Sequence, residues 1–369
     1  FKGYMWGGIM AMITQRSVIA FICENDWFLT TYNSVYARVN NAGQFITTNL
    51  NNNMGEPEQK IGDNYGVAEE DIATVISEDK SIFWFDRKNT AEVRMDYGRA
   101  TDITLEDAQM GEQGGVQSYI NTKMQFIGLW NDTHAKKDRF DIVSGIDTER
   151  GLLYLTFRPR RNNANELWSY VNTERDVNLS MQETLVYSIE DRKWSMFVGF
   201  APEAYGRLKG NAANVEMFSF AAGLPYYHNN TPNTSYLQFY GIDSEPVFTC
   251  VFNDEGALNK IAQSVSHDCN NVGWFIDSIY TNEKNSFSYI PLNYFKKKEN
   301  MYYAPLLRDA NSYPNPFNNE TWRSMLVDGK RIFGRYIVFR MVGDDNYPNT
   351  YRQLNNVYLL TTESVNNKK

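Results

Sequence analysis

The sequence predicts an all-β chain with minor helix, in which propeller-like meanders of short antiparallel strands precede a C-terminal β-rich region. Aromatic residues make up 15% of the 369 residues, and such side chains fit the half-buried surface of a sheet. Short apolar runs also recur between polar turns along the chain. The clearest example runs from Glu183 to Tyr205, where an alternating strand, a charged turn and a strand led by Trp194 predict a hairpin.

Residues 1–235 are predicted to hold the meanders. The first meander is expected to have strands at Ile9–Ile13, Val18–Cys23 and Trp27–Tyr32. The Asn- and Gly-rich segment Asn40–Tyr65 is expected to be an extended loop. The later strands are expected at Ile72–Ile76, Ile82–Phe85, Glu92–Met95, Phe140–Val143, Leu152–Phe157, Val215–Phe220 and Leu224–Tyr227, together with the Glu183–Phe200 hairpin. We also expect a helical turn at Thr104–Asp107 and a long polar segment at Arg158–Val177.

Residues 236–369 are predicted to form a second β-rich domain. Its strands are expected at Tyr236–Tyr240, Val247–Phe252, Gly273–Tyr280, Phe287–Phe295, Ile332–Val342 and Val357–Thr362. The segment Gly256–Ser264 is expected to be helical because Leu258 and Ile261–Ala262 recur at a helical spacing. The segment Pro305–Gly329 is rich in Asn, Pro and Asp and is expected to be a long surface loop.

The charge of the chain limits the kinds of partner that it can bind. The formal net charge is −8 at pH 7, which disfavours tight wrapping of nucleic acid because that would need clustered Lys and Arg. The same charge is compatible with an acidic channel through which DNA slides without binding tightly. The apolar N-terminal stretch is broken at Gln15 and Arg16, so neither half approaches the length that a membrane span needs. No membrane span is therefore expected.

Cysteine and histidine patterns indicate no metal or cofactor site. Cys23, Cys250 and Cys269 are too scattered for a disulfide framework or a zinc site, and we expect buried free thiols. The three histidines, His134, His228 and His267, lie at no metal-ligand spacing from one another. Within His267-Asp268-Cys269, neighbouring residues of an extended chain point apart, so they cannot pair as base and nucleophile by themselves.

Other catalytic patterns are scarce as well. The sequence has no GxSxG elbow, and its Gly-rich pieces, Gly7-Gly8 and Gly111–Gly115, do not fit a phosphate loop. Propellers do host glycosidases, which use two carboxylates about 5 to 10 Å apart. The candidates for such a pair are Asp141, Asp147, Glu183 and Asp191. Most lie at predicted turns, where Asp favours bonds to its local backbone. We therefore predict no enzyme and keep a glycosidase as the alternative.

Three further groups have a structural and a functional interpretation. Asp344-Asp345-Asn346 is expected to be a hairpin turn, since it lacks the Gly and distal Glu of a calcium loop. Lys296-Lys297-Lys298 is expected to be a solvated turn, with a phosphate contact as the alternative. Trp27, Trp194 and Trp274 are expected to pack in cores, with carbohydrate stacking as the alternative.

The order of several short aromatic motifs resembles that of the tail nozzle or muzzle proteins of short-tailed, crAss-like bacteriophages. The similarity covers about Ile72 to Val342. It includes a Trp-led strand followed by Pro-Glu, a Phe-Ser-Phe strand, a Phe-Tyr-Gly turn, a Val-Phe-Asn strand end, a Lys in a predicted helix and a second Trp-led strand. The residues that carry it are Trp194, Pro202, Phe218, Phe220, Tyr240, Gly241, Asn253, Lys260 and Trp274.

The resemblance implies a virion structural protein that forms a homo-oligomeric ring around the DNA conduit and serves DNA retention and ejection. It implies ring or portal proteins and tail fibres as partners, DNA that passes without sequence-specific binding, and assembly in the host cytoplasm before incorporation into the tail. It brings no active-site residue and no cofactor. It also implies that a chain starting at Phe1 is the distal or C-terminal part of a larger muzzle chain. Two alternatives stay open: a β-propeller protein that binds or hydrolyses bacterial surface polysaccharide, and a receptor-binding tip with exposed aromatics.

Overall fold

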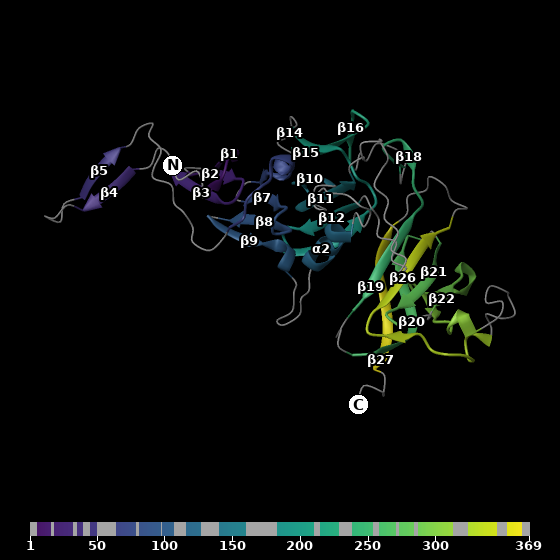
Figure 1. The fold of residues 1–369 in the computed structure, drawn as a ribbon. Helices are drawn as coiled ribbons and strands as arrows, with labels where there is room; N and C mark the ends of the chain where they lie inside the picture. The colour runs from purple at the N-terminus through teal and green to yellow at the C-terminus, as the bar shows by residue number, and fades with distance from the viewer. Residues whose placement is uncertain are drawn as a thin grey trace. The chain divides into compact units, whose positions relative to one another are not determined.

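The computed structural model divides the chain into two compact units, Phe1–Asn230 and Thr231–Lys369, drawn in Figure 1. The structure describes residues 6–15, 18–31, 35–39, 45–49, 64–78, 81–96, 98–106, 116–126, 140–159, 183–209, 215–228, 238–253, 258–270, 273–283, 287–312, 324–344 and 353–363. Every strand pair among them is antiparallel, and the sheets have two to five strands. The all-β prediction is confirmed.

The first sheet is the meander predicted at the N-terminus. It consists of β1 (Ile9–Gln15), β2 (Val18–Cys23) and β3 (Trp27–Thr31) in chain order. A separate hairpin follows, formed by β4 (Val35–Val39) and β5 (Phe45–Asn49). The prediction of a loop over Asn40–Tyr65 is therefore wrong at β5, where the β-forming run Phe-Ile-Thr-Thr outweighs the Asn-rich surroundings.

The second sheet contains β6 (Ile76–Glu78), β7 (Ser81–Asp86), β8 (Ala91–Asp96) and β9 (Arg99–Asp102). The predicted strand at Ile72–Ile76 is mostly wrong, because the 3-10 helix η1 (Glu69–Thr74) occupies it. Thr74 Oγ1 donates to the Asp71 carbonyl oxygen at 2.7 Å, which closes this turn from within. A second 3-10 helix, η2 (Ile103–Leu105), stands where the helical turn was expected.

The third and fourth sheets complete unit 1. The third contains β10 (Phe140–Asp147), β11 (Leu152–Pro159), β12 (Glu183–Ser188) and β13 (Lys193–Val198), which confirms the Glu183–Phe200 hairpin. The fourth contains β14 (Ala204–Lys209), β15 (Val215–Ala221) and β16 (Leu224–Tyr227). The helix α2 (Val116–Phe126) was not predicted. Gly111–Gly115 and most of the predicted polar segment Arg158–Val177 lie outside the described residues.

The four meanders of unit 1 pack face to face in chain order. On β7, Ile82 and Trp84 pack against the first sheet, whereas Phe83 and Phe85 pack against the third. Tyr154 and Val186 of the third sheet pack against Met217 of the fourth. Each inner sheet thus buries both faces through the two-residue alternation of its strands.

The first strands of successive meanders also meet. β10 contacts both β6 and β14, and Arg207 of β14 pairs with Glu78 of β6 at 2.6 Å. Contacts between the first strands of successive sheets also occur in propellers, whose four-stranded blades are set around an axis. None of the sheets formed by the described residues closes into a barrel.

Unit 2 is a sandwich of two sheets around one core. One sheet has the order β19 (Val247–Phe252), β26 (Ile337–Gly343), β21 (Trp274–Thr281), β22 (Phe287–Ile290). In the other, β20 (Lys260–Cys269) pairs with β27 (Leu354–Glu363), β24 (Met301–Pro305) and β25 (Phe333–Gly334), and β23 (Lys296–Lys298) pairs with β24. Residues of both sheets, such as Val265 and Phe339, share one buried cluster. A short hairpin, β17 (Gln238–Phe239) and β18 (Ile242–Asp243), precedes the sandwich.

Several predictions for unit 2 are wrong. Within Gly256–Ser264 the described residues from Lys260 onward belong to β20, so the helical prediction is wrong there; a bulge between Ala262 and Ser264 interrupts the two-residue alternation that would have signalled a strand. The Pro305–Gly329 segment is not simply a surface loop, since Leu307 and Met325 are buried against Tyr289 and the 3-10 helix η5 (Ala310–Ser312) lies within it.

The remaining differences concern strand bounds. Ile332–Val342 is split into β25 and β26, and the predicted strand Phe287–Phe295 ends at Ile290, after which Pro291 starts the 3-10 helix η4 (Leu292–Tyr294). No helix in the described part of the chain is long and apolar enough to cross a membrane.

Candidate functional site

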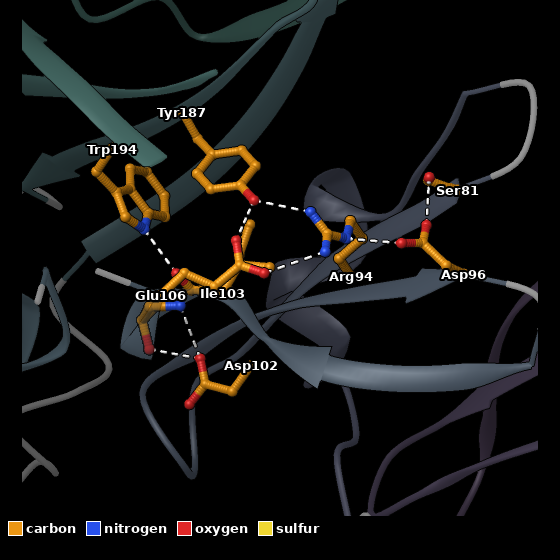
Figure 2. A network of polar contacts seen from close by, with 9 residues as sticks. Ser81, Arg94, Asp96, Asp102, Ile103, Glu106, Tyr187 and Trp194 are labelled. Atoms are coloured by element: carbon orange, nitrogen blue, oxygen red, sulfur yellow. Dashed lines mark hydrogen bonds and ion pairs between the residues drawn. The ribbon is translucent and has the colours of Figure 1, made fainter. Parts of the chain in front are cut away.

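A buried network of polar side chains connects the second and third sheets of unit 1 (Figure 2). Its centre is Arg94 on β8, which is almost fully buried. The guanidinium donates to the Tyr187 hydroxyl at 2.8 Å and to Glu106 Oε1 at 3.1 Å, and its Nε lies 2.9 Å from Asp96 Oδ2. Tyr187 in turn donates to Glu106. Burial and this hydrogen bond raise the pKa of Tyr187, so its hydroxyl keeps its proton.

Trp194 belongs to this network, whereas the sequence suggested core packing, with carbohydrate stacking as the alternative. Its Nε1–H donates to the Ile103 carbonyl oxygen at 2.8 Å, and its ring lies 5.3 Å from that of Tyr187. Asp102 caps η2 by accepting from Thr104 N at 2.9 Å, and Gln117 of α2 donates to its other oxygen at 3.3 Å. The network therefore joins β8, η2, α2, β12 and β13. It is closed to solvent at its centre, so it can lock two sheets together.

Glu92 lies beside this network but differs from its members in its hydrogen bonding. It is directly opposite Phe85 on the neighbouring strand and is 0% exposed, and neither carboxyl oxygen has a hydrogen-bond partner among the described residues. Burial, followed by the charges of Asp102 and Asp71, raises the pKa of Glu92 well above its usual range. Asp71 itself is paired with Arg87 through two contacts of 2.7 and 2.6 Å.

A serine and a histidine also meet in unit 1, with the geometry of a nucleophile and its base. Ser219 Oγ lies 2.6 Å from His228 Nε2, and the Phe200 ring lies 5.1 Å from the imidazole. Ser219 is 0% exposed, however, and burial lowers the pKa of His228. A substrate cannot reach the hydroxyl in this conformation. The sequence did not suggest the pair, because a β-hairpin brings the two residues together.

Three of the four carboxylates proposed for a glycosidase accept hydrogen bonds from named partners. Asp147 accepts from the backbone N–H groups of Glu149 and Arg150, at 3.1 and 3.2 Å. Glu183 accepts from the Tyr119 hydroxyl at 2.5 Å, and Asp191 accepts from Ser188 Oγ at 3.0 Å. Asp141 is exposed on β10. These contacts shape turns and strand ends.

The cysteines and His267 show no metal-binding arrangement. None of the three cysteines forms a disulfide; Cys23 and Cys269 are buried, as predicted, whereas Cys250 is half-buried. Burial raises the pKa of the Cys23 and Cys250 thiols to about 11. His267 stacks on Tyr302 with ring centroids 5.2 Å apart, and neither ring nitrogen has a hydrogen-bond partner among the described residues. Burial lowers the pKa of His267 to about 4. No group of three His, Cys, Asp or Glu in the described ranges could hold a metal ion, and His134 lies outside them.

The residues of the phage-like motifs occur in both units and serve turns and cores. In unit 1, Pro202 is buried after β13, and the rings of Phe218 and Phe220 on β15 lie 5.3 Å apart. In unit 2, Tyr240 and Gly241 form the turn between β17 and β18 with positive φ values of 54° and 78°, a conformation typical of tight hairpins.

The other motif residues of unit 2 lie at strand ends. Asn253 is exposed just after β19. Lys260 begins β20 instead of lying in a helix, and its Nζ donates to the Arg335 carbonyl oxygen at 2.6 Å. Trp274 begins β21 and is buried in the sandwich core, while Trp27 is buried in unit 1.

One of the two remaining predicted groups is a strand instead of a turn. The lysine run is the edge strand β23, and the turn that follows it is Glu299-Asn300. The prediction of a lysine turn is therefore wrong, because the tyrosines of β24 pair with these residues. Asp344 donates its backbone N–H to the Gly273 carbonyl oxygen, whereas Asp345 and Asn346 lie outside the described residues.

Neither a scan of known protein families nor a search of curated proteins finds a match to this sequence.

Proposed function

We propose that this chain is a structural, non-enzymatic subunit of a phage tail nozzle or muzzle, which stands in a homo-oligomeric ring around the DNA conduit. Two things support the proposal: the order of the aromatic motifs in the sequence, and one structural observation. In the described part of unit 2, the sandwich protects the sheet edges on one of its sides and leaves the edges on the other side open.

The protected edges are β22 and β23. They lie on the same side of the sandwich because only the short segment Pro291–Phe295 joins them. β23 consists of three exposed lysines, and lysines on an edge strand discourage pairing with another chain. β22 is covered by the chain after β24, since Ser288 Oγ donates to the Leu307 carbonyl oxygen and the Phe287 N–H donates to Asp309.

The open edges are β19 and β27, which lie at the opposite ends of the same two sheets. They carry no lysine or arginine. Val251 on β19 is 60% exposed, and Leu360 on β27 is 58% exposed. Unpaired N–H and C=O groups beside exposed apolar side chains are a template for strand addition by another chain. We infer that this side receives a neighbouring subunit.

The net negative charge of the chain is consistent with a wall around a DNA conduit. A net charge of −8 at pH 7 on a ring repels DNA phosphates, so that DNA passes without sticking. The proposal includes the partners implied by the resemblance: ring or portal proteins, tail fibres, and DNA in the lumen. It places the assembled chain in the virion, after assembly in the host cytoplasm.

The experiment compares the native mass of the wild type with that of a Val251→Lys/Leu360→Lys double variant and of a Val327→Lys control. Val327 is more exposed than either edge residue and lies outside both edges. We expect particles of several times 42.7 kDa for the wild type and the control, and a folded monomer for the double variant. An unchanged particle in the double variant would show that the open side is not the contact.

A carbohydrate-binding role is the second candidate, and one observation favours it. Tyr303 and Tyr358 are both cross-strand partners of Ser266, so they share the outer face of one sheet. Their backbones are two strand spacings apart, about 10 Å, and exposed aromatic rings can stack on sugars. Binding of host surface polysaccharide that is lost in Tyr358→Ala would support this role, and hydrolysis of it would support the glycosidase alternative.

A further inference from the structure

Glu92 occupies a position where a charged carboxylate has nothing to stabilise it. Its cross-strand partner Phe85 packs against α2 and the third sheet, so Glu92 lies on the same face, inside that interface. The side chain is 0% exposed, and within the described part of the chain neither oxygen has a hydrogen-bond partner. A buried, unpaired carboxylate is strongly disfavoured, and such a group holds its proton instead.

The cations nearest to Glu92 along the fold are already engaged. Arg87, in the turn before β8, forms a two-contact pair with Asp71 of η1. Arg94, two residues further along β8, is shared among Tyr187, Glu106 and Asp96. Neither guanidinium can turn to Glu92 without giving up contacts to the carboxylates that it already holds.

The other titratable groups on the surrounding elements make ionisation of Glu92 harder. Asp71 and Asp102 act on it as negative charges, and both have their own hydrogen-bond donors. Asp86 of β7 accepts from the Gly66 N–H and from Asn89. From α2, Gln117 donates to Asp102 and Tyr119 to Glu183. An ionised Glu92 would therefore add one more negative charge to a closed acidic cluster.

We propose that Glu92 makes the contact of the second sheet with α2 and the third sheet depend on a proton: the contact is closed while the carboxyl is protonated and opens when the proton passes to solvent. Opening would bring water to the carboxylate, and the groups that α2 inserts there, Ile120 and Met124, would separate from Phe85. This inference goes beyond the proposed ring and stands whether or not the ring forms.

The sign of the effect follows from linkage. Since the pKa of Glu92 is higher in the folded chain than its unfolded value of about 4.5, the stabilising contribution is complete below that value and is lost as the pH rises toward the folded pKa. In that window the unfolding equilibrium constant should rise about tenfold per pH unit because of this one proton.

The test measures denaturant unfolding of the full chain from about pH 5 to about pH 9. The variants are Glu92→Gln, and Asp141→Asn as a control at an exposed carboxyl. We expect the ratio of the wild-type to the Glu92→Gln unfolding constant to rise with the slope of one proton, and the ratio for the control to stay flat. A flat ratio for Glu92→Gln, or a variant that is less stable than the wild type at every pH, would overturn the proposal.

A second measurement works even if Glu92→Gln fails to fold. Infrared titration of the wild type should show a carboxylic-acid carbonyl band that persists at neutral pH and disappears on alkalinisation, together with faster hydrogen exchange in α2 than the pH change alone produces. Absence of that band at neutral pH would mean that Glu92 is ionised and stabilised, which contradicts the proposal.

Discussion

Replacing Tyr187 by Phe tests the buried network, because it removes a single oxygen atom from it. The substitution keeps the ring, which packs at 5.3 Å from Trp194, and removes only the hydroxyl that accepts from Arg94 and donates to Glu106. Arg94 and Glu106 still pair with each other at 3.1 Å. No ion pair is broken, so the loss is limited to the two hydrogen bonds of the hydroxyl.

The magnitude follows from these contacts. A hydrogen bond to a charged group contributes about 1.5 to 3 kcal/mol. Because the two bonds are made by one atom and the ion pair survives, we expect a total loss of about 2 to 3 kcal/mol in the free energy of unfolding. For a unit of this size, that corresponds to a decrease in Tm of roughly 5 to 10 °C.

The assay is thermal and denaturant unfolding of the full chain, with Tyr227→Phe as the matched control. Tyr227 is an exposed tyrosine on β16 in the same unit, and its substitution should change stability by no more than about 0.5 kcal/mol. A Tyr187→Phe chain that unfolds within the same margin as the control would refute the view that this network locks the two sheets.

Two further predictions concern packing and pH. A Cβ added to Gly145 on β10 would lie 2.4 Å from the Tyr205 ring, so Gly145→Ala should cost about 1 to 3 kcal/mol by pushing the third and fourth sheets apart. Gly151→Ala cannot serve as its control because Gly151 has positive φ, whereas Gly199→Ala can, since a Cβ there meets nothing. Because the pKa of His267 is lowered from 6.5 to about 4, its contribution to the stability of unit 2 is present above pH 6.5 and is lost as the pH falls toward 4. A His267→Leu variant whose unfolding varied with pH in that window as steeply as the wild type would contradict this assignment.

Strands with a clean two-residue alternation were predictable from the sequence. The Glu183–Phe200 hairpin has such alternation on one strand and a four-residue polar turn, and it forms as predicted. Prediction failed where another local force competes. In β20, a bulge between Ala262 and Ser264 shifts the alternation, so the strand has no clean two-residue pattern. At η1, three acidic residues and the Thr74–Asp71 hydrogen bond favour a 3-10 turn over a strand.

The candidate site was harder to predict than the strands. α2 contains the β-branched and polar residues that weaken helix propensity, and only the i, i+4 pair Ile120 and Met124 signals its buried side. The network around Arg94 joins residues up to 93 positions apart. Such contacts depend on how whole sheets stack, and no local pattern in the sequence encodes them.

The native mass and symmetry of the particle that contains this chain test the central claim most directly. The account predicts a closed ring of identical subunits, with a mass that is a whole multiple of 42.7 kDa and rotational symmetry in averaged electron micrographs. A chain that stays monomeric at high concentration and alongside its tail partners would contradict it.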